Sequence, residues 1–83
     1  MLYRNIDLSY KLSDDKTLLT INYVEENKTG YKNIIKEYNL INIDDTITLY
    51  NTILDDLNAE YDDDLARLIN KLVDKIMKDN EGV

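Results

Sequence analysis

The chain has 83 residues and a net charge of −7, and it contains neither cysteine nor histidine. This length corresponds to one small domain with a modest core. The missing side chains exclude disulfides, thiolate or imidazole metal sites, and Cys-His or Ser-His-Asp catalysis. We therefore expect a protein that is not an enzyme and has no cofactor, although carboxylate, tyrosine or lysine chemistry stays open.

The first part of the chain predicts two β-strands. Residues 4–12 (RNIDLSYKL) alternate strictly between apolar and polar side chains, which is typical of a half-buried strand. Residues 17–24 (TLLTINYV) are rich in β-branched and aromatic residues, which favour strands. The side chains expected to face the core are Ile6, Leu8, Tyr10 and Leu12 in the first strand and Leu19, Ile21 and Tyr23 in the second.

Two turn signals separate the strands and lead into an ambiguous segment. Residues 13–16 (SDDK) have aspartates where turns favour them. Residues 26–30 (ENKTG) predict a tight hairpin loop that ends in Gly30, a residue able to adopt a positive φ without steric cost. The apolar residues of segment 31–43 fit both a helix and a strand, and the preceding hairpin signal favours a strand. The result is a three-stranded antiparallel meander.

The remaining chain predicts two amphipathic helices, within residues 44–58 and 62–80. The expected apolar stripes are Ile47, Tyr50, Ile53, Leu54 and Leu57 in the first helix and Leu65, Leu68, Ile69, Leu72, Val73 and Ile76 in the second. The fold class is therefore α+β: a single domain over 1–83, with a β-meander in 1–43 and, in 44–80, two helices packed on one sheet face. The broad stripe of the second helix should pack on the first helix or, alternatively, form a homodimer.

Charge is segregated along the chain. Residues 1–43 hold six acidic and six basic residues, so the second half carries the whole net charge. No basic residue occurs between Lys36 and Arg67, and the nine acids of that window are Glu37, Asp44, Asp45, Asp55, Asp56, Glu60, Asp62, Asp63 and Asp64. Helix capping explains about two acids at each helix start, and general acidity favours solubility. Segregation of this kind also marks interaction surfaces, and both interpretations stay open.

The acidic segment offers little for other chemistry. Adjacent acids at 62–64 lack the alternate spacing, the glycine and the final glutamate of a calcium loop. The two glycines, Gly30 and Gly82, form no phosphate-binding loop. Direct nucleic-acid binding through this half is disfavoured because phosphates would be repelled. A rigid array of carboxylates can instead resemble DNA and compete for the basic groove of a nucleic-acid-binding protein.

Residues 58–64 (NAEYDDD) join the two predicted helices. This motif and the order of elements resemble the acidic helix–turn–helix of small phage anti-CRISPR proteins, which inhibit the type II CRISPR effector nuclease by DNA mimicry. The resemblance covers Asn58, Glu60, Tyr61, Asp62, Asp63 and Asp64, whereas the family member with this motif begins with a helix and has a longer acidic run. It implies that the carboxylates take the place of PAM guanines at the arginines that read them.

The expected function is therefore that of an acidic inhibitor that binds a nucleic-acid-handling protein. The expected target is a CRISPR effector nuclease loaded with guide RNA, whose basic cleft the inhibitor would block. The alternative is a non-enzymatic interaction module of a phage or mobile element, able to form a homodimer through its C-terminal helix. Tyr61 is expected either as a contact residue or, somewhat in preference, as a core ring before the helix. The expected partner-binding residues are Asp44, Asp45, Asp55, Asp56, Asn58, Glu60, Tyr61, Asp62, Asp63 and Asp64.

The same patterns bear on where the protein resides. The segment MLYRNIDLSYKL lacks the apolar run of a signal peptide. No stretch approaches the roughly 20 apolar residues of a membrane span. We expect a cytoplasmic protein, acting in the cytosol of a bacterial host, with no direct contact to nucleic acid or membrane.

Overall fold

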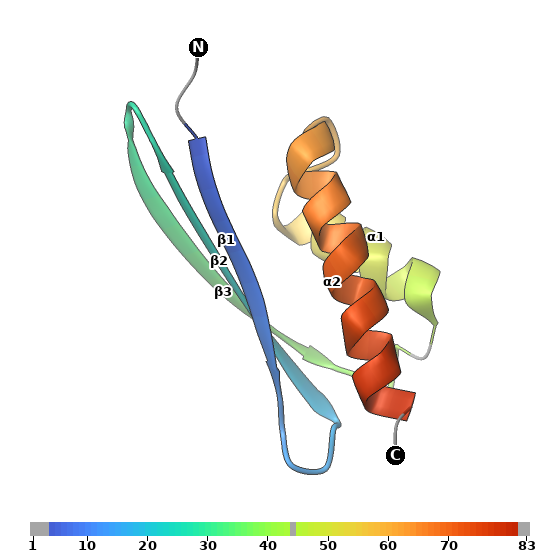
Figure 1. Ribbon diagram of the computed structural model, residues 1–83. Helices are drawn as coiled ribbons and strands as arrows, with labels where there is room; N and C mark the ends of the chain where they lie inside the picture. The colour runs from blue at the N-terminus through green and yellow to red at the C-terminus, as the bar shows by residue number, and fades with distance from the viewer. Residues whose placement is uncertain (1–3, 44, 82–83) are drawn as a thin grey trace.

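The computed structural model describes residues 4–43 and 45–81, which form an antiparallel sheet followed by two helices (Figure 1). The strands are β1 (Arg4–Leu12), β2 (Leu18–Asn27) and β3 (Gly30–Asn39), in the spatial order β1-β2-β3. The predicted meander is confirmed, and the ambiguous third segment is a strand. The alternation of buried and exposed residues explains why this segment is a strand. Ile34 pairs with Tyr23, and Tyr38 pairs with Leu19, on the face that the helices cover.

Side-chain hydrogen bonds close both hairpins. In the first turn, Asp15 Oδ1 accepts from the backbone N–H of Thr17 at 3.1 Å, and Lys16 has a φ of 61°. In the second, Asn27 Oδ1 accepts from the N–H groups of Thr29 at 2.9 Å and Gly30 at 3.1 Å. Gly30 does not use the positive φ that glycine permits, since no glycine of the described residues has one. The asparagine amide, rather than glycine's conformational freedom, fixes this loop.

Helix α1 (Thr46–Asp56) begins and ends with recognisable caps. Asp45 accepts from the backbone N–H of Thr48 at 2.7 Å and from its hydroxyl at 2.9 Å. At the other end, Asn58 has a φ of 58°. Its N–H donates to the Asp55 carbonyl at 3.1 Å, and the next N–H, of Ala59, donates to the Leu54 carbonyl at 2.9 Å. These two bonds form a Schellman motif, in which asparagine tolerates the left-handed conformation.

The buried face of α1 differs from the predicted one. Leu49 and Ile53 are fully buried, whereas Ile47 is 73% exposed. Ile47 lies more than a third of a turn from the midpoint between the buried Leu49 and Ile53, at 3.6 residues per turn. The expectation that Ile47 belongs to the core is therefore wrong, and Leu49 takes its place.

Helix α2 (Asp63–Glu81) runs alongside β1 and is attached to the first hairpin near both of its ends. Arg4 contacts Asp62 just before the helix. The Tyr10 hydroxyl donates to the Asp79 carboxylate, and Lys16 Nζ donates to the Asp79 backbone carbonyl at 2.7 Å. These contacts hold α2 parallel to β1 on one side of the sheet, and neither α1 nor α2 lies on the opposite side (Figure 1).

The core lies between the helix-facing side of the sheet and the two helices. Helix α1 packs on α2, which packs on β1, so the broad apolar stripe of α2 is shared between the sheet and α1. Leu68, at the edge of this stripe, is 36% exposed. The buried apolar residues are Leu19, Ile21, Tyr23, Tyr38, Leu40, Leu49, Ile53, Leu57, Ala59, Leu65, Ile69, Leu72, Val73 and Ile76.

Candidate functional site at the helix junction

The junction between α1 and α2 consists of residues 57–62. Leu57 and Ala59 are buried and anchor the link to the core. Glu60 is exposed, and Tyr61 is 93% exposed. The preferred expectation of a core ring at Tyr61 is therefore wrong. An aromatic ring this exposed contributes nothing to the core and is available to a partner.

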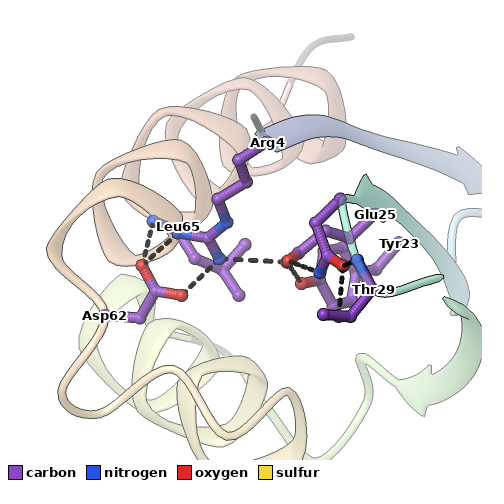
Figure 2. A network of polar contacts seen from close by, with 7 residues as sticks. Arg4, Tyr23, Glu25, Thr29, Asp62 and Leu65 are labelled. Carbon is purple, nitrogen blue, oxygen red and sulfur yellow. Dashed lines mark hydrogen bonds and ion pairs between the residues drawn. The ribbon is translucent and has the colours of Figure 1, made fainter. Parts of the chain in front are cut away.

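Asp62 belongs to an ion-pair network centred on Arg4 of the sheet (Figure 2). Arg4 Nη1 donates to Asp62 Oδ1 at 2.9 Å, and Arg4 Nη2 contacts the other carboxylate oxygen. The same Oδ1 accepts from the backbone N–H of Leu65 at 3.2 Å, so Asp62 also caps α2. The guanidinium hydrogen bond is the main cause of a pKa of Asp62 below its ordinary value. Asp62 thus has a counter-ion, which corrects the expectation that the acidic window is uncompensated.

Glu25 is the second carboxylate that Arg4 holds. Arg4 Nη2 lies 3.0 Å from Glu25 Oε1, and Glu25 is buried. The Tyr23 hydroxyl and Asn27 Nδ2 also donate to this carboxylate, the amide at 3.1 Å. Arg4 first, and then Tyr23, lower the pKa of Glu25 to about 2. Burial, followed by the hydrogen bond to Glu25, raises the pKa of Tyr23 to about 12.

Sequence reasoning missed this network, although a signal for it exists. Arg4 precedes Ile6 by two residues, and Glu25 follows Tyr23 by two, so both charged residues continue the core-facing positions of their strands. Opposite charges at core-facing positions of neighbouring strands predict a buried pair. The register places Arg4 opposite Asn27, diagonal to Glu25. The network joins β1, β2 and the helix junction into one rigid corner.

Several other predicted site residues have structural roles. Asp45 caps the start of α1, at the end opposite the junction. Asp56 accepts a hydrogen bond from the Tyr38 hydroxyl at 2.8 Å, and burial together with this bond raises the pKa of Tyr38. Asn58 provides the left-handed residue that ends α1. Asp44 lies outside the described residues.

The acids in or next to the junction that have no internal partner within the described ranges are Asp55, Glu60, Asp63 and Asp64. Asp55 and Glu60 line the same shallow hollow, of about 180 Å³. Asp63 and Asp64 are exposed in the first turn of α2, where the helix dipole favours negative charge. Neither forms an ion pair with Arg67, one turn further along. The described structure thus leaves four carboxylates without an internal partner within residues 55–64, the segment that also holds the exposed Tyr61.

The described residues contain no group of three acids arranged to hold a metal ion. Among the same residues, no helix has both the length and the apolar character needed to cross a membrane. Comparison of the chain with protein-family models, curated proteins and solved structures finds no match.

Proposed function

We propose that this protein is an acidic inhibitor that occupies the DNA-binding cleft of a nucleic-acid-handling protein. Its most specific form is an anti-CRISPR protein that blocks PAM binding by a CRISPR effector nuclease through DNA mimicry. The observation that carries the proposal is the acidic junction, which we define as Asp55, Glu60, Tyr61, Asp63 and Asp64. Its four carboxylates have no internal partner in the described part of the chain, and its tyrosine is almost fully exposed.

Electrostatics favour a basic partner for this surface. Duplex DNA carries one charge per roughly 1.7 Å of axis, and the clefts that bind it are lined with arginine and lysine. Carboxylates accept bidentate hydrogen bonds from arginine, as PAM guanines do. The contact of Arg4 with both oxygens of Asp62 illustrates this geometry at the edge of the junction. Tyr61 supplies the kind of aromatic contact that dominates many protein interfaces.

Rigidity is the second requirement, because a mobile acidic loop would lose ordering entropy on binding. The Schellman motif at Asn58 and the cap at Asp62 fix the two helix ends that the junction connects. The Arg4 network attaches Asp62 to the sheet. We therefore assign Asn58 and Asp62 the task of positioning the junction, and the exposed residues the task of contacting the partner.

The test is competition for DNA. A type II CRISPR effector nuclease loaded with guide RNA is mixed with a fluorescent PAM-containing duplex, and anisotropy is followed as the protein is added. The triple variant Glu60→Gln, Asp63→Asn, Asp64→Asn spares the Arg4 contact. We expect it to compete at least about tenfold less well than the unmodified protein, because charged pairs at the centre of an interface are costly to lose.

A matched variant separates surface from net charge. The control Asp14→Asn, Glu37→Gln, Asp74→Asn removes three exposed acids elsewhere. It should compete as well as the unmodified protein, and competition should weaken as salt rises. If both triple variants compete for the nuclease equally poorly, net charge alone explains the inhibition. An unmodified protein that leaves DNA binding unchanged at low salt would refute inhibition of this class of effector.

A further inference from the structure

The outer edge of β1 is unpaired. β1 is the first strand in the order β1-β2-β3, and within the described residues its backbone groups that point away from β2 have no backbone partner. Unpaired strand edges of this length readily accept a further strand. We propose that β1 pairs antiparallel with β1 of a second copy of this chain, about a two-fold axis at Ser9. The two sheets then form one continuous six-stranded sheet.

The charges of β1 select this register. Antiparallel pairing about Ser9 places Asp7 opposite Lys11 of the second copy and, by symmetry, Lys11 opposite Asp7. Both side chains are exposed, and neither has an ion-pair partner in the described part of the chain. The β2 residues that pair with them are uncharged: Val24 lies opposite Asp7, and Thr20 lies opposite Lys11. Moving the axis to Leu8 places Ser9 opposite Asp7 and Asn5 opposite Lys11, and moving it to Tyr10 places serine opposite both charges. Either shift loses both pairs.

Apolar residues match on the other face of the strand. The same register places Ile6 opposite Leu12 of the second copy, and Leu8 opposite Tyr10. These four side chains are only partly buried in the single chain. Beside them runs a groove of about 280 Å³ between β1 and α2, lined by Ile6, Asp7, Leu8, Leu68, Lys71, Leu72 and Lys75. A second strand at this edge therefore removes further apolar surface from water.

The opposite edge of the sheet does not offer this match. On β3, Lys32 and Lys36 occupy one face, whereas Glu37 lies on the other. A two-fold axis perpendicular to the sheet pairs residues of the same face, so no register of β3 with itself brings this acid opposite either lysine. The axis at Ile34 instead places Lys32 opposite Lys36. Charged residues protect edge strands from association, and on β3 this protection is intact.

The inference concerns β1 alone and does not depend on what the acidic junction binds. Arg4, which marks the junction end of β1, lies five residues from the axis, or about 17 Å along an extended strand. The assembly therefore presents two acidic junctions at opposite ends of the paired strands.

Charge exchange tests the register. The full chain and the variants Asp7→Lys, Lys11→Asp and Asp7→Lys/Lys11→Asp are compared by sedimentation equilibrium, with circular dichroism to verify folding. We expect the unmodified chain to dimerise. Each single reversal creates two like-charge pairs and should raise the dimer dissociation constant about tenfold or more. The double exchange restores both the pairs and the native net charge, and it should restore the dimer.

Lys36→Glu on β3 is the matched control, because it changes net charge by the same amount as Lys11→Asp. It should leave the dissociation constant unchanged. Several outcomes overturn the proposal: an unmodified chain that stays monomeric at the highest concentration measured, a dimer indifferent to both single reversals, or a double exchange that associates no better than the single variants. A dimer that responds to Lys36→Glu alone would place the interface on β3 instead.

Discussion

Substitution of Arg4 is the most direct test of the ion-pair network that joins β1, β2 and the helix junction. Arg4→Met keeps a long side chain but removes the guanidinium that holds Glu25 and Asp62. The Asp62 pair is partly exposed and contributes up to about 1 kcal/mol. Glu25 is buried and keeps only the donors of Tyr23 and Asn27, so losing its cation costs about 1–3 kcal/mol. We expect the free energy of unfolding to fall by about 2 kcal/mol.

Urea denaturation at neutral pH, followed by circular dichroism, measures this loss. In a domain of this size it corresponds to a fall in melting temperature of roughly 8–16 °C. Arg4→Lys keeps the charge but loses the planar fork that spans two carboxylates, so it should lie between the unmodified protein and Arg4→Met. A change below about 0.5 kcal/mol in Arg4→Met, which is typical of an ordinary surface site, would refute the role assigned to the network.

Three further predictions probe the fold. The pKa of Glu25 is about 2 in the folded protein, against an ordinary value of 4.5. The stability that this carboxylate contributes is therefore complete above pH 4.5 and is lost as pH falls towards 2, by roughly 3 kcal/mol at most. Urea titrations across this pH range should show the loss, and Glu25→Gln should flatten the pH dependence of stability. Leu49→Ala should cost about 3 kcal/mol and Ile47→Ala under about 0.5 kcal/mol, and the reverse order would contradict the observed face of α1. At Asn58, alanine should cost about 1 kcal/mol whereas glycine should be tolerated, as thermal melts can verify, because only the alanine is strained at a φ of 58°.

The strands were predictable because their pattern has a period of two and a single buried face. Leu19, Ile21 and Tyr23 lie where the alternation of β2 puts them. The rotation of α1 was harder to predict, because its apolar residues extend over more of the helix circumference than α2 covers. Contact with α2 decides that Leu49 is inside and Ile47 outside, and no local signal carries that information.

At the junction, the sequence indicated where acids gather but not which of them are free. Asp62 and Arg4 are separated by 58 residues, and their contact exists only because α2 runs alongside β1. The exposure of Tyr61 likewise depends on Leu57 and Ala59 occupying the adjacent core. Helix capping by aspartate was predictable, because it depends on neighbours within one turn.

The attachment of α2 to the first hairpin also governs how the protein is made. These contacts join residues that are separated by between 58 and 69 positions in the sequence. The ribosome therefore completes the entire sheet long before it completes α2. During that interval the leucine and isoleucine side chains of β1 and β2 face water, and a bare sheet of three strands is at best marginally stable. We therefore expect nascent chains to be substrates for chaperones until α2 emerges, and to fold in one late, cooperative event.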